Sequence, residues 1–289
     1  MKINRQNAGV LPPGRQVRGE GKNLGVHGAL AVNPRSAFTM VEIAICLAII
    51  GFALVAIIGV LPIGMNTQRD NREETVINQD ATMFIEAIRN GARGLDDLTN
   101  YVYAISNFWT SYQPDGTVKS SAVNGYVYSN LSVSPLYFTT LGSPINNGTN
   151  IIGVLSTPEY MDNSGVPLGN IFNTTGYYSN HIVAYVRSLS GPAVEKPPQD
   201  NPIIQQDSFG YRILCVNAPV AVDTNIYNQQ LTANLHELRL TFLWPELPGG
   251  SVGPSRQTWR TMVAGQIVTN IVAGQILYFY QPQSFVNAP

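Results

Sequence analysis

The sequence predicts an α+β fold in which one long N-terminal helix packs on a mostly antiparallel β domain. Three observations predict it: an apolar run that starts at Phe38, an apolar stripe at helical spacing that follows, and short apolar segments separated by turn-forming residues thereafter. They divide the chain into a basic leader, a membrane-spanning half-helix, an amphipathic half-helix and a β-rich domain, which cover residues 1–37, 38–65, 66–98 and 99–289.

The composition argues against some classes of protein. Hydrophobic residues make up 44% of the 289 residues, which is enough for a core, whereas charged residues make up only 12%, about half of the usual share of roughly 25%. The formal net charge is −1. A nucleic-acid-binding protein would show a surplus of basic residues, so no nucleic-acid partner is expected. The low charge and the many turn formers instead favour an exported, β-rich surface that contacts other protein.

The leader is polar and basic, and it shows no apolar periodicity. It contains one acid, Glu20, against six basic residues: Lys2, Arg5, Arg15, Arg18, Lys22 and Arg35. These outweigh the basic residues Arg69 and Arg72 beyond the apolar run, and positive charge favours the cytoplasmic side of a membrane. The leader is therefore expected in the cytoplasm and the C-terminal domain outside it.

The apolar run from Phe38 to Met65 carries Glu42 as its only charge. At about 1.5 Å per residue, the uncharged part from Ile43 to Met65 is long enough to cross a hydrocarbon core of roughly 30 Å. The alternative is a cleaved secretory signal, whose apolar region is about 7–15 residues long and precedes a small-residue cleavage site. This run is longer and no such site follows it, so a single membrane span is predicted.

Glu42 is unusual in such a run. An ionised acid within an apolar helix costs about 2.5–3.5 kcal/mol by insertion scales, so it points to a function and needs a partner. Alternatively, Glu42 lies only four residues from Phe38 and can sit at the level of the lipid headgroups. Both interpretations can hold at different times.

The stretch Ala37-Phe38-Thr39-Met40-Val41-Glu42, followed by the apolar run, resembles the class III leader of type IV pilins and type II secretion pseudopilins. The resemblance implies that a prepilin peptidase cuts between Ala37 and Phe38 and methylates the new amine of Phe38. It also implies that Glu42 neutralises the α-amine of a neighbouring subunit in the filament. The sequence departs from the family in two ways: Ala37 stands where the family nearly always has glycine, and the leader is long.

The resemblance also implies a pilin-like form of the predicted α+β fold, together with partners and a location. The partners are the prepilin peptidase, other pilin or pseudopilin subunits, the inner-membrane assembly platform and membrane lipid. The location is the bacterial inner membrane, crossed once, with a cytoplasmic N-terminus and a periplasmic C-terminal domain. A domain of about 190 residues is larger than that of most major pilins, which favours a minor subunit. A membrane-anchored binding module that never polymerises is the alternative, and a tethered enzyme is the third hypothesis.

Two sets of residues shape the long helix beyond the first turns. Gly59, Pro62 and Gly64 predict a break or kink near the end of the span, because proline removes a backbone hydrogen bond. The second half is predicted to be amphipathic and to end at Gly91 and Gly94. Its charged residues, Asp80 among them, are assigned mostly to the polar side. Its predicted apolar stripe comprises Val76, Ile77, Met83, Phe84, Ala87 and Ile88.

The remainder of the chain is predicted to form strands. Alternation is clearest where Leu238, Leu240, Phe242 and Trp244 should share one buried face. Loops are predicted over 191–202 and 245–254. The predicted strands are 125–133, 137–140, 151–155, 181–188, 210–216, 235–244, 258–263 and 275–280.

No catalytic residue, metal site or cofactor is expected. The histidines His27, His181 and His236 do not form the spacing of a zinc protease, and the serines Ser188 and Ser190 lack the leading glycine of a nucleophile elbow. Asp162-Asn163-Ser164-Gly165 has too few acids for a calcium loop and is interpreted as a turn. Cys46 and Cys215 are expected to be small buried hydrophobes without a disulfide.

Overall fold

The structure of the protein is a computed structural model. The chain divides into two compact units, residues 1–60 and 61–289, and each is described by itself. The leader with Ala37, Gly94, His27 and the predicted loop 191–202 lie outside the described residues. The structure describes residues 38–91, 96–127, 140–141, 147–168, 175–190, 209–220, 231–247, 250–272 and 274–286.

The long helix is present as α1, Met40–Arg89. It ends where the sequence predicts, because Gly91 adopts a positive φ of 68° and its N–H donates to the carbonyl of Ile88 at 3.2 Å. A Cβ on Gly91 would lie 2.7 Å from the carbonyl oxygen of Tyr280 in the last strand. Both the backbone angle and the close approach therefore require glycine.

The second half of α1 buries the predicted stripe, with one exception and two additions. Ile77, Phe84 and Ile88 are almost fully buried, and Val76 and Ala87 are also buried. Met83 was predicted in the stripe, but it is 41% exposed, because it lies one residue, or about 100° around the helix, from the buried Phe84. Ala81 and Asp80 are fully buried in its place, so the assignment of Asp80 to the polar side is wrong.

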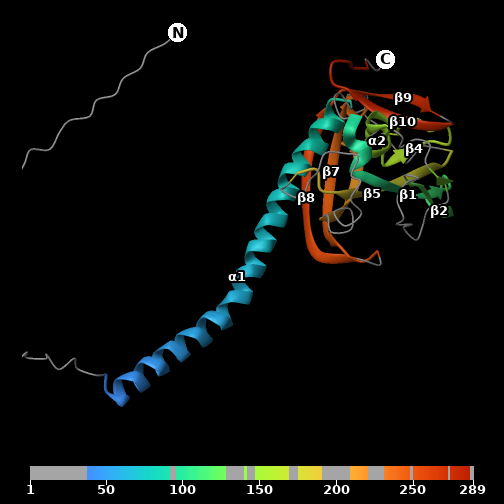
Figure 1. The fold of residues 1–289 in the computed structure, drawn as a ribbon. Coiled ribbons are helices and arrows are strands. Elements are labelled where there is room, and N and C mark those ends of the chain that lie inside the picture. The colour runs from blue at the N-terminus through green and yellow to red at the C-terminus, as the bar shows by residue number, and fades with distance from the viewer. Residues whose placement is uncertain are drawn as a thin grey trace, which may run out of the picture. The chain divides into compact units, whose positions relative to one another are not determined.

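The main sheet is almost entirely antiparallel, as predicted (Figure 1). Its strand order is β3-β2-β1-β5-β6-β7-β8, β4 pairs with β5, and β2 with β3 is the parallel pair. A 3₁₀ helix, η1 (Asp96–Asn100), leads into it. The strands are β1 (Val102–Tyr112), β2 (Val118–Val127), β3 (Thr140–Leu141), β4 (Tyr160–Met161), β5 (Tyr177–Arg187), β6 (Gly210–Pro219), β7 (Leu235–Glu246) and β8 (Val252–Ala264).

Strand β7 shows the predicted alternation. Leu238, Leu240 and Phe242 are fully buried and Trp244 is nearly so, whereas the residues between them are half-buried. Their face of the sheet meets α1, and Phe84 packs edge-on against Phe242 with ring centroids 6.5 Å apart. Burial of each such side chain contributes about 1.5–3 kcal/mol.

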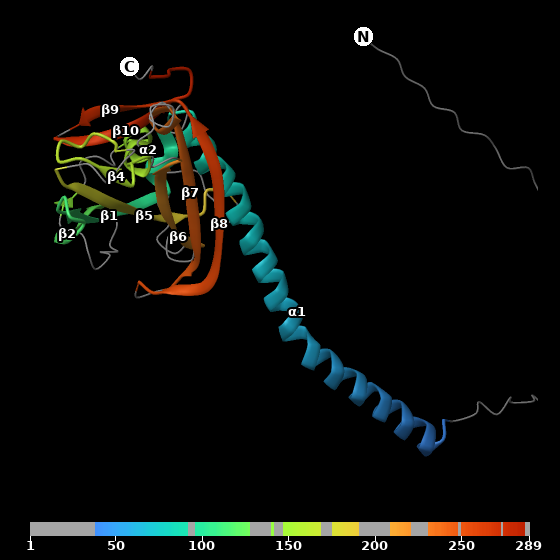
Figure 2. The ribbon, with the colours of Figure 1, turned by 180° about the vertical axis from the view of Figure 1, so that it is seen from behind.

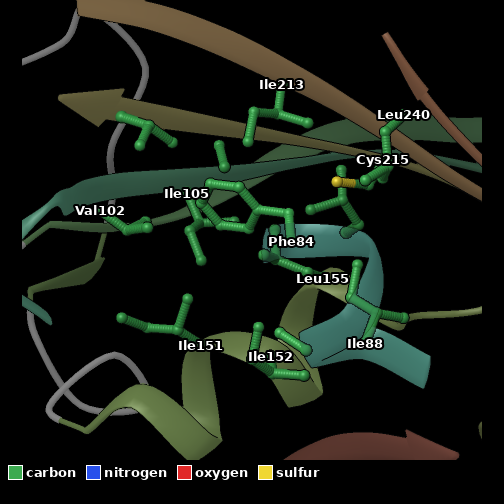
Figure 3. Close-up of a cluster of buried hydrophobic side chains, with 14 of the residues drawn as sticks. Phe84, Ile88, Val102, Ile105, Ile151, Ile152, Leu155, Ile213, Cys215 and Leu240 are labelled. Atoms are coloured by element: carbon green, nitrogen blue, oxygen red, sulfur yellow. The ribbon is translucent and has the colours of Figure 1, made fainter. Parts of the chain in front are cut away.

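A second, two-stranded sheet is formed by β9 (Gln266–Val272) and β10 (Gln275–Gln281). Both views show this hairpin beside the short helix α2, Gly148–Leu155 (Figures 1 and 2). The contact is close, because a Cβ on Gly153 of α2 would lie 2.9 Å from the Cβ of Leu277 and 2.6 Å from the ring of Phe279. Side chains of α1, α2 and the sheet meet in one core (Figure 3).

Several local predictions were wrong. Residues 151–155 were predicted as a strand but belong to α2, whose N-cap Asn147 accepts a hydrogen bond from the N–H of Asn150 at 2.7 Å. The predicted loop 245–254 is strand at both ends, because β7 continues to Glu246 and β8 starts at Val252. Strands β1, β4 and β9 were not predicted. The predicted strands 125–133 and 137–140 overlap β2 and β3, and their remaining residues lie outside the described part.

The two cysteines differ in their environments. Cys215 is buried in β6 among apolar side chains, as predicted, whereas Cys46 is exposed on α1, so the prediction of burial is wrong there. Both cysteines are free thiols.

Candidate functional site

The first turn of α1 holds the residues that the sequence singles out. Thr39 immediately precedes the helix, and its hydroxyl accepts a hydrogen bond from the N–H of Glu42 at 3.3 Å. In return, the Glu42 carboxylate accepts hydrogen bonds from the N–H of Thr39 at 3.3 Å and from its hydroxyl at 3.4 Å. This reciprocal arrangement is a capping box, which satisfies N–H groups that the first helical turn leaves without partners.

The capping box gives Glu42 a local role that the sequence analysis missed. A threonine followed three residues later by a glutamate, directly before an apolar run, is its sequence signature, and Thr39 and Glu42 carry it. The carboxylate also lies at the positive end of the helix dipole. Phe38, next to this turn, is 75% exposed, and Ala37 lies outside the described residues.

The surface of α1 beyond this turn is apolar and exposed. The helix is long and apolar enough to cross a membrane, judged by length and composition, and the most apolar part of it is not buried within the chain. The large side chains that are exposed there include Ile43, Ile45, Leu47, Ile49, Ile50, Phe52, Leu54, Val55, Ile57, Ile58, Val60, Leu61, Ile63 and Met65. Such a surface requires lipid or another apolar partner to cover it.

The residues of the predicted break lie within continuous helix. Pro62 is inside α1, and a Cβ at Gly59 or Gly64 would meet no atom within 4 Å. These glycines are therefore not required by packing within one chain. Loosening of the helix at this point stays a prediction.

An open groove runs along the exposed side of α1 in its second half. Its volume is about 700 Å³. Glu86 is the only ionisable residue in the lining, so the groove does not gather groups for acid–base chemistry. It is lined by Thr75, Asn78, Gln79, Thr82, Met83, Glu86 and Ser190.

Three other residues of the domain, His181, His236 and Asp162, carry groups that could take part in catalysis or metal binding. His181 is exposed, whereas His236 is buried beside Tyr280, and burial lowers its pKa to about 4. Asp162 accepts hydrogen bonds from the N–H groups of Ser164 and Val166, so the segment is a turn, as predicted. Among the described residues, no group of histidine, cysteine, aspartate or glutamate side chains could hold a metal ion.

Ser188 and Ser190 follow the end of β5, and the hydroxyl of Ser190 donates to the carboxylate of Asp80 at 2.6 Å. A nucleophilic serine needs a base that can take its proton and a third group to orient that base. The Asp80 carboxylate already accepts hydrogen bonds from Leu189 and Tyr211, so the arrangement resembles a structural network.

Comparison of the chain with protein-family models, curated protein sequences and solved structures gave no match.

Proposed function

We propose that this chain is a prepilin-like structural subunit, a minor one, of a type IV pilus or a type II secretion pseudopilus. The observation that carries the proposal is the single acid, Glu42, in the first turn of a helix whose next 23 residues are uncharged and whose apolar surface is exposed. An acid at this place is useful when the helix leaves lipid and packs against other helices, because it can pair there with an opposite charge.

In the proposed pathway, the prepilin peptidase cuts between Ala37 and Phe38 and methylates the amine of Phe38. The chain crosses the inner membrane once, with the leader in the cytoplasm and the β domain in the periplasm. The assembly platform then transfers it from lipid to the other pilin or pseudopilin subunits. The proposal includes no catalytic residue, cofactor, metal or nucleic acid.

A membrane-anchored binding module that never polymerises is the second candidate, and one observation favours it. The capping box with Thr39 occupies the Glu42 carboxylate within its own helix end, so this acid has a use even in a chain that never meets another copy. A module of this kind would keep the span and the domain, but it would need neither the peptidase nor the assembly platform.

N-terminal mass spectrometry of the membrane-bound chain distinguishes the two candidates. The chain is expressed with and without a prepilin peptidase, extracted in detergent and digested. The filament proposal predicts a peptide that starts at Phe38, with a methylated amine, only when the peptidase is present. An Ala37→Gly variant, which restores the glycine typical of the family, should be processed at least as well.

An intact leader in both strains, for the natural chain and for Ala37→Gly, would contradict the filament proposal and leave the anchored module. A cut beyond Met65 would contradict both candidates, since the domain would then be secreted without its span.

A further inference from the structure

Asp80 interrupts the apolar face with which α1 covers the sheet. It is fully buried, and its neighbours on the same helix face, Ile77, Ala81 and Phe84, are buried as well. A carboxylate in such a place is costly unless hydrogen bonds replace its water. The position therefore needs an explanation beyond burial of the helix.

Three donors surround the Asp80 carboxylate. The N–H of Leu189 donates to Oδ2 at 2.9 Å, the hydroxyl of Tyr211 donates to Oδ2 at 2.8 Å, and the hydroxyl of Ser190 donates to Oδ1 at 2.6 Å. Leu189 and Ser190 directly follow β5, whereas Tyr211 belongs to β6. The carboxylate thus joins α1 to two neighbouring strands at one point of the sheet.

The apolar contacts of α1 do not by themselves fix the position of the helix along the sheet. A slide by one helical turn, about 5.4 Å, would bring Ala81 to the place of Ile77 and Ile88 to the place of Phe84. Apolar side chains would still meet an apolar sheet. Asp80, however, would move to the place of Val76 or Phe84 and lose all three donors, which would leave a buried polar group unpaired.

We propose that Asp80 is a positioning residue that fixes the axial register of α1 on the sheet, and that its contribution is uniqueness of docking rather than stability. Buried polar residues fix the register of packed helices in a similar way, at a cost in stability. The proposal holds for a filament subunit and for an anchored module alike, so it does not depend on the proposed function.

The electrostatics of the site support the statement that Asp80 does not contribute stability. Burial raises the pKa of Asp80 above its ordinary value, and the hydrogen bonds from Ser190, Tyr211 and Leu189 offset only part of that effect. The folded chain therefore holds the ionised carboxylate at a disadvantage relative to water. An apolar side chain of similar size would avoid this disadvantage.

Asp80→Leu in the full chain, in detergent micelles, tests the proposal. Spin labels on Thr82→Cys of α1 and Thr258→Cys of β8, both exposed positions, report the register as a distance distribution. Cys46→Ser removes the accessible native thiol, and the buried Cys215 stays. Urea unfolding reports stability. We expect an unchanged or higher urea midpoint together with a second distance, displaced by up to about 5 Å, the rise of one turn.

Asp70→Leu, at an exposed position of the same helix, is the matched control and should keep a single distance. Tyr211→Phe keeps the ring and removes one donor, so it should lower the urea midpoint without adding a second distance, because Asp80 still has two donors. A single, undisplaced distance in Asp80→Leu would overturn the proposal, since shape alone would then set the register. A large loss of stability in Asp80→Leu would overturn it too, and an unchanged midpoint in Tyr211→Phe would show that this donor does not hold the carboxylate.

Discussion

At the residue scale, Glu42 combines a local contact with a proposed distant one. The capping box requires an acceptor at this position, and glutamine can serve as well as glutamate. Pairing with the amine of another subunit, in contrast, requires the negative charge. The two roles can therefore be separated by substitutions that remove one and keep the other.

We expect Glu42→Gln to keep the helix end and to impair incorporation into filaments strongly, because breaking a buried charge pair costs about 3–5 kcal/mol. Thr39→Ala keeps the charge and should cost only about 1 kcal/mol at the helix end, with incorporation retained. Glu42→Val removes both roles and should still insert into the membrane. Immunoblots of sheared filaments and of membranes measure the distribution. Equal impairment in Thr39→Ala and Glu42→Gln would indicate a capping role alone.

His236 should make the domain sensitive to acid. Its pKa is lowered by burial from 6.5 to about 4, so between these values the unfolded chain binds more protons than the folded chain, and stability falls as the pH falls. At 1.36 kcal/mol per pKa unit, the loss from pH 7 to pH 4 is up to about 3 kcal/mol. Urea unfolding of the full chain in micelles at several pH values measures it.

Asp80 opposes this trend, because a raised pKa favours the folded state at low pH and that stability is lost as the pH rises through it. Comparison with His236→Gln isolates the histidine, since Asp80 is common to both chains. His236→Gln should show a smaller loss on acidification, and His181→Gln, at an exposed position, should behave as the natural chain. An identical pH profile for His236→Gln would show that His236 is accessible to protons in the folded state.

Asp80 and Thr39 show where sequence patterns mislead at this scale. Charge alone placed Asp80 on the polar side of its helix, although its spacing from Ile77 and Phe84 is that of the buried face. The donors that make its burial possible come from Leu189, Ser190 and Tyr211, which are far along the chain, and no local sequence pattern predicts their contact with Asp80. The Thr39 signature, in contrast, is local and could have been recognised.

At the element scale, neighbouring residues of α1 offer a matched pair. Phe84 is buried in the core and Met83 is exposed beside the groove. Phe84→Ala should lower the free energy of unfolding by about 3–5 kcal/mol, as expected for a large core side chain replaced by alanine. Met83→Ala should change it by no more than about 0.5 kcal/mol. Urea unfolding measures both, and similar losses would contradict the orientation of the helix.

The contact between α2 and β10 depends on the absence of a side chain at Gly153. Gly153→Ala would place a Cβ against Leu277 and Phe279, and we expect a loss of about 1–3 kcal/mol from overpacking despite the better helix propensity of alanine. A second change, Phe279→Leu, should recover part of the loss. Gly64→Ala, where the space is open, is the control. A stabilised Gly153→Ala variant, measured by thermal unfolding, would contradict this packing.

Elements were predictable where their pattern was long and regular. The alternation of β7 and the stripe of α1 span many residues, and each has one period. The run at 151–155 is short and apolar throughout, which suits a strand or a buried helix equally. Only the cap at Asn147 decides for helix α2. Strand β1 contains the polar residues Ser106, Asn107 and Ser111, which interrupt the apolar pattern from which a strand would be predicted.

At the scale of the whole molecule, the fold class was predictable but the strand order was not. Pairing of β1 with β5, at the centre of the sheet, joins segments separated in the sequence by β2, β3, α2 and β4. Neither strand carries a local signal for its partner. Antiparallel hairpins such as β7 with β8 are simpler, because adjacent strands in the sequence usually pair.

The proposed orientation predicts a clear pattern of labelling in cells whose outer membrane is permeabilised and whose inner membrane is intact. A cysteine at Lys119, exposed in β2, should react with a membrane-impermeant maleimide. In cells that lack a prepilin peptidase, where the leader is retained, Lys22→Cys should react only after the inner membrane is opened. Cys46→Ser serves as the background, and buried Cys215 should stay unlabelled because burial raises its pKa and shields its thiol. The reverse pattern would invert the proposed topology.

The contact between Gly91 and Tyr280 has a consequence for biosynthesis. The turn that ends α1 is closed by the backbone of β10, so translation must proceed past Tyr280 before this joint can form. The membrane segment, in contrast, emerges early and can insert at once. We therefore expect the domain to complete its folding only after translocation, and a translational arrest before β10 should leave a membrane-inserted chain whose domain is readily degraded by protease.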